Sequence, residues 1–208
     1  MRRLAVALAV AGTLVLLAGC TAEGDRDGSP VASVSTGSSE AAPTTPGGPL
    51  TADTGLLPCP EVFGGPAQGP DTLPPMTFDC IGGGSLDLGQ AAGVPRVVSL
   101  WGSWCPPCRE ELPVVQQLAD VAGDRVQVLG VATRDRLTAA DSFAADAGVT
   151  FPSAYDREGE LMVQLGINAL PYTYFVDAAG SVTFVQVGPV KTLADFEQLV
   201  SEHLGVQL

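Results

Sequence analysis

The feature that most constrains this chain is a pair of cysteines separated by two prolines, Cys105-Pro106-Pro107-Cys108. The pair directly follows an apolar, β-rich run at residues 97–101 and precedes apolar residues that recur at helical spacing. At such a strand-to-helix junction the first sulfur lies over the helix N-terminus, where unpaired amides and the helix dipole favour a thiolate. The second sulfur is close enough to form a disulfide with the first. The sequence therefore predicts a reactive cysteine pair at the end of a β-strand.

The remaining apolar periodicity predicts a single α/β domain over residues 56–208. Two strand–helix units come first, and a β-hairpin around Asp177-Ala178-Ala179-Gly180 precedes a last amphipathic helix. The pairs Thr138/Asp141 and Thr192/Asp195 have the spacing of capping boxes at the starts of the second and last helices. The predicted elements occupy residues 97–101, 105–122, 126–132, 138–147, 172–176, 182–187 and 192–204. This order favours a mixed central sheet with helices on both faces.

The first twenty residues have the features of an export signal. Two arginines precede a largely apolar run at residues 4–17, which is short for a membrane span and typical of a signal peptide. The sequence Leu17-Ala18-Gly19-Cys20 resembles the lipobox of bacterial lipoproteins, in which the cysteine is diacylated and the chain is cut before it. We therefore expect a signal peptide over residues 1–19. Because two acyl chains anchor a protein stably, we expect Cys20 to hold the chain on the extracytoplasmic face of the bacterial cell membrane. An ordinary secretory signal cut nearby is the alternative.

The segment that follows Cys20 differs sharply from the predicted domain. Residues 21–54 are dominated by Ser, Thr, Gly, Pro, Ala and Asp, and they contain no aromatic residue. Such a segment buries too little apolar area to offset its ordering entropy. Residues 20–55 are therefore predicted to be a lipidated cysteine followed by a disordered tether.

The charge balance argues against a nucleic-acid-binding function. The chain has a formal net charge of −13, from 10 basic and 23 acidic residues. Because Arg2 and Arg3 lie in the predicted signal peptide, the mature chain is more acidic still. Such a surface repels phosphate backbones, so we expect no nucleic-acid partner. The single histidine, His203, also argues against most histidine-based triads and histidine-rich metal sites.

The five cysteines divide into one lone residue and two pairs. With Cys20 assigned to lipid and Cys105 to Cys108, there remain Cys59 and Cys80, which bracket a Pro/Gly-rich stretch with little capacity to form a core. We expect a structural disulfide between them, worth about 3 kcal/mol by loop-entropy reasoning. A second redox centre is the alternative. A zinc site at Cys105 would need ligands that few residues could supply, so no metal or other cofactor is expected.

Two segments resemble the thioredoxin superfamily, and more closely its TlpA/ResA-like branch of extracytoplasmic thiol–disulfide oxidoreductases. They are residues 101–113, WGSWCPPCREELP, and residues 166–177, GINALPYTYFVD. The resemblance implies a thioredoxin-like fold and a cis Pro171 that faces the cysteine pair and shapes the surface that partner backbones contact. For Trp104 an ordinary core position is the alternative. The substrate-contacting residues implied in this way are Trp104, Pro106, Pro107, Leu170 and Pro171.

Glu111, three residues after Cys108, matches the position at which the ResA-like branch holds an active-site glutamate. We hypothesise that it manages the proton of Cys108, helped by a pKa raised through partial burial. A solvated carboxylate on the helix surface is the alternative.

The residues between the cysteines predict the direction of electron transfer. Pro106 and Pro107 have no amide hydrogens, and no Lys or His lies between the cysteines to stabilise the Cys105 thiolate. A poorly stabilised thiolate destabilises the reduced form. The sequence therefore predicts a reductant with a potential more negative than about −180 mV, the value for protein disulfide isomerase.

Together these features predict a lipid-anchored enzyme that reduces specific protein disulfides, with Cys105 as nucleophile and Cys108 as resolving thiol. The resemblance implies apocytochrome c cysteines as one substrate class and a membrane electron donor of the CcdA type. Three alternatives remain: an oxidase or isomerase for secreted proteins, a thioredoxin-fold copper metallochaperone, and a passive envelope lipoprotein with a vestigial site. The metallochaperone usually needs a cysteine pair spaced by three residues and a nearby histidine, whereas this pair is spaced by two.

Overall fold

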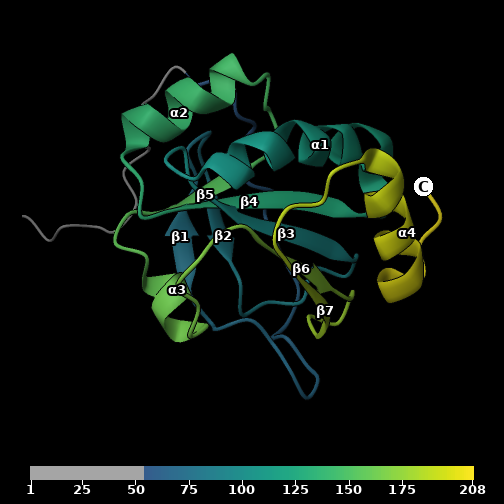
Figure 1. Cartoon of the computed structure of the whole chain (residues 1–208). Coiled ribbons are helices and arrows are strands. Elements are labelled where there is room, and N and C mark those ends of the chain that lie inside the picture. Colours follow the sequence, from purple (N-terminus) through teal and green to yellow (C-terminus); the bar gives the residue numbers. More distant parts are fainter. Residues whose placement is uncertain (1–53) are drawn as a thin grey trace, which may run out of the picture. The chain divides into compact units, whose positions relative to one another are not determined.

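The computed structural model describes residues 54–208. The predicted signal peptide, Cys20 and the tether up to residue 53 lie outside the described residues. The centre of the domain is a five-stranded sheet with the strand order β5-β4-β3-β6-β7 (Figure 1). Its strands are β3 (Arg96–Trp101), β4 (Gln127–Thr133), β5 (Ser153–Asp156), β6 (Tyr172–Val176) and β7 (Val182–Val187).

The sheet is mixed. Strands β3, β4 and β5 run parallel, whereas β6 is antiparallel to β3 and β7 is antiparallel to β6. Strand β3 is buried along its whole length, as expected for an apolar central strand covered on both faces. The carboxyl ends of the three parallel strands meet at one edge. The start of β6 reaches the same edge, because Tyr172 pairs with Leu100 near the end of β3.

Helices cover both faces of this sheet (Figure 1). One face packs against α1 (Pro106–Ala122), α2 (Leu137–Asp146) and α4 (Leu193–Leu204). The other packs against the short helix α3 (Glu160–Gln164) and a two-stranded sheet of β1 (Thr77–Asp79) and β2 (Ser85–Asp87). A 3₁₀ turn, Gly123–Arg125, links α1 to β4. None of the helices between residues 54 and 208 is long and apolar enough to cross a membrane.

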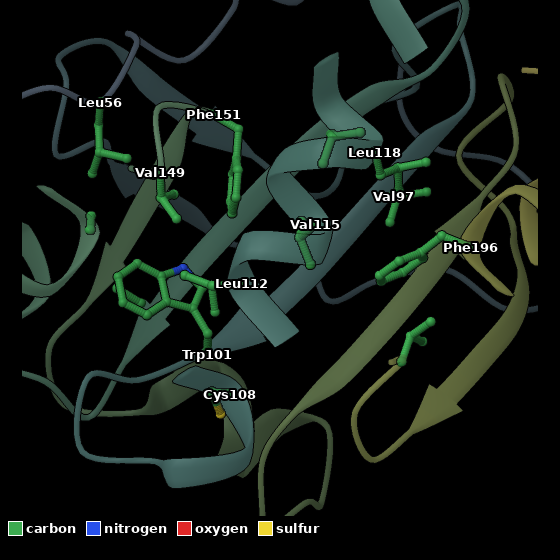
Figure 2. Close-up of a cluster of buried hydrophobic side chains, with 14 of the residues drawn as sticks. Leu56, Val97, Trp101, Cys108, Leu112, Val115, Leu118, Val149, Phe151 and Phe196 are labelled. Atoms are coloured by element: carbon green, nitrogen blue, oxygen red, sulfur yellow. The ribbon is translucent and has the colours of Figure 1, made fainter. Parts of the chain in front are cut away.

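The larger core lies between α1 and the sheet (Figure 2). Apolar residues of α1 at helical spacing point toward the sheet, and Trp101 closes the end of the core nearest the cysteines. Burial of these side chains provides most of the driving force that holds α1 in place. The fully buried side chains labelled in the figure include Trp101, Leu112, Val115, Leu118 and Phe196.

The predicted fold class, a mixed sheet with helices on both faces, is confirmed, but the predicted start of α2 is wrong. The helix begins at Leu137, and Thr138 lies inside it rather than at its cap. The Leu137 amide instead donates to the hydroxyl of Tyr155 on β5, at 3.0 Å. By contrast, Thr192 caps α4 as predicted, since its hydroxyl accepts from the Asp195 amide at 3.2 Å.

Several short elements were not predicted. Strand β5 has four residues, α3 has five, and β1 and β2 have three each. Such lengths are too short for hydrophobic periodicity to separate a strand from a helix or a loop.

Candidate active site

The cysteine pair lies where β3 leads into α1. Cys105 is the N-cap residue of α1 and keeps an extended backbone, while Cys108 lies in the first turn. The two sulfurs form a disulfide, with 5.3 Å between the Cα atoms. Cys105 is 3% exposed and Cys108 is fully buried at the start of α1, at the end of the core that Trp101 closes (Figure 2). The cysteine with the larger exposed fraction is therefore the one expected to be the nucleophile.

The two prolines occupy the first two positions of α1, where the missing amide hydrogens cost no helical hydrogen bond. Within residues 54–208, the backbone amide that donates to the Cys105 sulfur is that of Cys108, at 3.3 Å. A helix N-terminus ordinarily offers several unpaired amides, so this one provides fewer donors to a thiolate than most.

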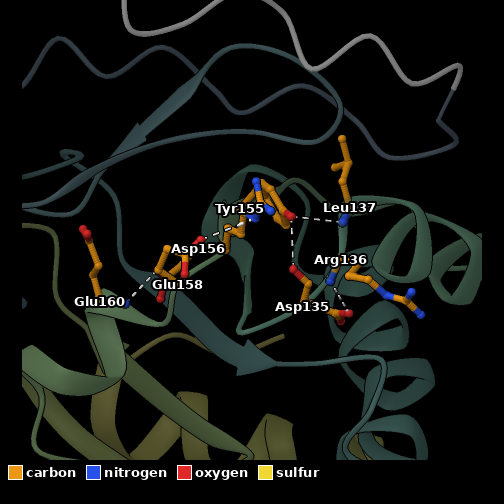
Figure 3. A network of polar contacts seen from close by, with 8 residues as sticks. Asp135, Arg136, Leu137, Tyr155, Asp156, Glu158 and Glu160 are labelled. Atoms are coloured by element: carbon orange, nitrogen blue, oxygen red, sulfur yellow. Dashed lines mark hydrogen bonds and ion pairs between the residues drawn. The ribbon is translucent and has the colours of Figure 1, made fainter. Parts of the chain in front are cut away.

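The turn before the nucleophile is held by a residue that sequence reasoning missed. Asp135, which follows β4, is buried, and its carboxylate accepts hydrogen bonds from the Ser103 amide at 2.5 Å and the Ser103 hydroxyl at 2.8 Å. It also accepts from the Arg136 amide at 2.8 Å (Figure 3). The available signal was topological: polar residues at the carboxyl ends of neighbouring parallel strands meet at one edge.

Trp104 lies beside Cys105 and is half exposed, with 51% of its surface accessible. Its indole nitrogen donates to the carbonyl of Thr133 at 3.3 Å, which ties the turn to the end of β4. The ring also covers Gly102, where a Cβ atom would lie 2.6 Å from that nitrogen. Trp104 is thus fixed in place and still presents an apolar surface next to the nucleophile.

The second signature segment reaches the same edge of the sheet. The peptide bond between Leu170 and Pro171 is cis, and Pro171 directly precedes the start of β6. Leu170 is partly buried and packs against the core cluster that contains both Cys105 and Cys108. Of the two prolines between the cysteines, Pro106 is exposed and Pro107 is partly buried.

Glu111 is fully buried on the inner face of α1, one turn after Cys108. Its Oε1 accepts a hydrogen bond from the Val190 amide at 2.9 Å, while Oε2 has no partner among the described residues. Burial raises the pKa of Glu111 from 4.5 to about 7; the Val190 hydrogen bond and the charge of Lys191 oppose this shift. A carboxyl group with this pKa can both take up and release a proton near neutral pH.

The second cysteine pair, Cys59 and Cys80, lies away from the active-site pair. Cys59 and Cys80 form a disulfide with 6.0 Å between their Cα atoms, and both are almost fully buried. They belong to the core on the opposite face of the sheet from Cys105 and Cys108. The Cys80 segment pairs with Ala154 of β5, so this disulfide joins the N-terminal part of the domain to the sheet edge.

Cys20 lies outside the described residues, so its predicted lipid attachment stays a prediction. Between residues 54 and 208 there is no group of three or more His, Cys, Asp or Glu side chains that could hold a metal ion.

Comparison with known proteins assigns the family. The redoxin family model matches residues 68–200, which is more than half of the chain and includes both signature segments. This chain belongs to the redoxin family.

Individual relatives of this redoxin narrow the assignment. The thiol–disulfide oxidoreductase ResA of Geobacillus thermodenitrificans is 28% identical over 128 residues, which cover 61% of this chain and 73% of the relative. A thiol:disulfide interchange protein DsbE homolog of Paracoccus denitrificans is 34% identical over 96 residues, 46% of this chain and 51% of the relative. The structure of a secreted Mycobacterium tuberculosis disulfide oxidoreductase homologous to Escherichia coli DsbE matches with a TM-score of 0.55 and 25% identity, over 62% of this chain and 96% of that one.

These findings confirm the predicted thioredoxin-like fold and the predicted ResA-like branch. This redoxin is a thiol–disulfide oxidoreductase of the ResA/DsbE type.

Proposed function

We propose that this redoxin is an extracytoplasmic reductant of protein disulfides that acts through the dithiol of Cys105 and Cys108. The observation that carries this direction is the sparse hydrogen bonding of the Cys105 sulfur, to which the Cys108 amide donates while Pro106 and Pro107 have no amide hydrogen to offer. A poorly stabilised thiolate makes the reduced form less stable relative to the disulfide, so the dithiol passes its electrons on readily.

The reaction proceeds in two exchanges. The Cys105 thiolate, having lost its proton to solvent, attacks one sulfur of the client disulfide; the client S–S bond breaks and its second sulfur leaves as a thiolate. Cys108 then loses its proton and attacks the Cys105 sulfur, which releases the first client sulfur. Two electrons pass to the client, whose thiolates take up two protons, and the enzyme is left with the disulfide between Cys105 and Cys108.

Glu111 is the group that we propose accepts the Cys108 proton. It lies on the same buried face of α1 one turn from Cys108, and no other carboxyl group of α1 is buried. Its pKa of about 7 lets it take the proton from Cys108 and return it to the client thiolate or to solvent.

Clients are polypeptides that carry a disulfide, and apocytochrome c cysteines are one class that this branch of the superfamily suggests. Trp104, Pro106 and Pro107 surround the nucleophile, and Leu170 with cis Pro171 forms the other side of the contact surface. The electrons that restore the dithiol come from a membrane donor of the CcdA type in this proposal.

The proposed location rests on the N-terminal sequence. Residues 1–19 are a lipoprotein signal peptide, Cys20 carries the lipid, residues 20–55 are the tether and residues 56–208 are the catalytic domain. The M. tuberculosis relative is described as secreted, which agrees with an exported enzyme. Replacing Cys20 with Ala should move the protein out of the membrane fraction; unchanged membrane association would exclude the lipid anchor.

The decisive experiment is a Cys108→Ser trap in the full chain. Without the resolving thiol, the mixed disulfide at Cys105 accumulates, and mass spectrometry of the captured species identifies the clients. A Cys105→Ser variant is the matched control and should capture nothing. Capture of the same proteins by both variants would exclude Cys105 as the nucleophile.

The direction of transfer needs its own measurement. Equilibration of the wild-type protein with glutathione or dithiothreitol buffers should give a potential more negative than about −180 mV. A potential well above that value would instead favour the oxidase or isomerase function. An inert protein with intact thiols in an insulin-reduction assay would favour the passive lipoprotein.

A further inference from the structure

Positive charge is distributed unevenly over this acidic domain. The Lys and Arg residues between positions 54 and 208 are Arg96, Arg109, Arg125, Arg134, Arg136, Arg157 and Lys191. Arg96 is buried, and Arg125 follows the C-terminal end of α1, where it donates to the carbonyls of Val121 and Gln207. Arg109 lies in the first turn of α1, and Arg134 and Arg136 follow β4. Arg157 follows β5, and Lys191 lies just before α4. They thus lie at or near the sheet edge that carries the cysteine pair.

We call Arg109, Arg134 and Arg136 the arginine patch. Arg109 contacts the turn that presents Cys105, while Arg134 and Arg136 lie in the segment after β4 that supports this turn. The Arg134 side chain packs against Gly159 in the loop after β5. Arg134 and Arg136 flank Asp135, whose carboxylate holds Ser103 two residues before the nucleophile. The Arg109 guanidinium donates to the Ser103 carbonyl at 3.4 Å and lies 4.7 Å from the ring centre of Phe143 on α2.

The patch keeps its charge available to a partner. All three arginines are exposed, and none of them forms an ion pair within the described part of the chain. Asp135 forms no ion pair with Arg136: its oxygens accept from Ser103 and from the Arg136 backbone amide, and the Arg136 side chain extends away from it (Figure 3). Its single negative charge stands against the three guanidinium groups of the patch.

The other exposed cations at this edge are already paired. Lys191 contacts Glu110 at 2.7 Å, and Arg157 contacts Glu158 at 3.4 Å in the loop after β5. Glu160, at the start of α3, is exposed beyond that loop. With three guanidinium groups and the one carboxylate of Asp135, the patch carries an excess of positive charge.

We infer that the arginine patch, together with the exposed face of Trp104, docks polypeptide clients whose disulfide is flanked by acidic residues. This inference rests on the proposed function and adds that the enzyme prefers clients with acidic residues next to the disulfide. Guanidinium groups bind carboxylates with two parallel hydrogen bonds, and Trp104 adds an apolar contact beside the nucleophile. At physiological ionic strength charges more than about 8 Å away are largely screened, so the local patch outweighs the distant acidic surface.

The test compares two peptides that share one disulfide loop and differ only in having aspartate or lysine on both sides of it. The reduced full chain is mixed with each peptide and with bis(2-hydroxyethyl) disulfide, an uncharged reference, and the second-order rate constants are measured. We expect the acidic peptide to react about tenfold faster than the basic one at low salt. High salt should bring this ratio close to one.

The variant R134Q/R136Q should lower the acidic-to-basic ratio toward one. The ratio is the useful quantity because a change in the pKa of Cys105 affects both peptides alike. The control R125Q removes a cation beyond the C-terminal end of α1 and should leave the ratio unchanged.

The outcomes distinguish a failure of the proposed function from a failure of the docking inference. A reduced wild-type protein that reacts with none of the three disulfides overturns the proposed function. If it reacts with all three but does not favour the acidic peptide, the docking inference is overturned. An unchanged ratio in R134Q/R136Q, or an equal loss in R125Q, overturns it as well.

Discussion

At the scale of single residues, Glu111 is the group whose protonation links the stability of the fold to its chemistry. Its carboxyl is buried with one oxygen that has no partner between residues 54 and 208, and burial raises its pKa from 4.5 to about 7. Between these two values the folded protein binds more protons than the unfolded chain. Its free energy of unfolding therefore falls as the pH rises through this window and is fully restored below pH 4.5.

We predict that Glu111→Gln removes this pH dependence. Relative to the variant, the oxidised wild-type protein should lose on the order of 3 kcal/mol of unfolding free energy between pH 4.5 and pH 7.5. Denaturant unfolding at a series of pH values measures the difference, in which the titration of all other groups cancels.

Glu110→Gln is the matched control, because Glu110 is the exposed neighbour that pairs with Lys191. The free energy of unfolding of Glu110→Gln should keep the wild-type decrease between pH 4.5 and pH 7.5. The same variants test the proton-transfer role: the resolving step of Glu111→Gln should lose its dependence on pH near 7. A wild-type pH–rate profile in that variant would leave Glu111 with a structural role only.

At the scale of an element, the N-terminus of α1 sets the redox potential through the number of donors that it offers to Cys105. Two of its first amide positions are prolines, and the amide of Cys108 donates to the sulfur. The helix dipole still favours a thiolate there, but it acts through fewer hydrogen bonds.

Replacing Pro107 with His should therefore make the protein more oxidising. The substitution restores an amide hydrogen and adds a group that can be cationic, and both stabilise the Cys105 thiolate. We expect a rise in potential of about 30 mV or more, with a lower pKa for Cys105. Thiolate absorbance in a pH titration and equilibration with glutathione measure the two quantities.

Pro113→Ala provides the control for this prediction, since this proline lies inside α1 beyond the first turn. It should change the stability of the helix without a comparable change in potential. A Pro107→His potential equal to or below that of the wild type would contradict the account of the helix N-terminus.

At the scale of the whole molecule, the disulfide between Cys59 and Cys80 stabilises the fold and lies apart from the catalytic cysteines. It closes a loop of 21 residues and belongs to the core on the face of the sheet opposite the active-site cysteines. It joins the segment that carries β1 and β2 to the edge strand β5. Both sulfurs are nearly fully buried, which agrees with a structural role.

We predict that the double variant C59A/C80A loses about 3 kcal/mol of unfolding free energy. Its rate of insulin reduction below the unfolding transition should stay within about twofold of wild type, because additivity holds for distant sites. Mass mapping under graded reductant should show the active-site disulfide opening first. If the Cys59–Cys80 disulfide opened first, it would be a second redox centre.

The sequence by itself determined the parts of this protein that depend on neighbours in the chain. The strand, the cysteine pair and α1 follow one another within residues 96–122, so their spacing was enough to predict a dithiol at a helix N-terminus. The hairpin and the cap of α4 are local in the same way, whereas the start of α2 was mispredicted because Tyr155, from another strand, supplies its contact.

Only the tertiary structure decided how the site is supported and charged. Asp135 reaches Ser103 across 32 residues, and Glu111 reaches Val190 across 79. The arginine patch exists because parallel β3 and β4 end at the same edge. Burial of Glu111, and the absence of ion pairs at the patch arginines within residues 54–208, depend on what packs around each side chain. Residue spacing along the chain carries no information about that packing.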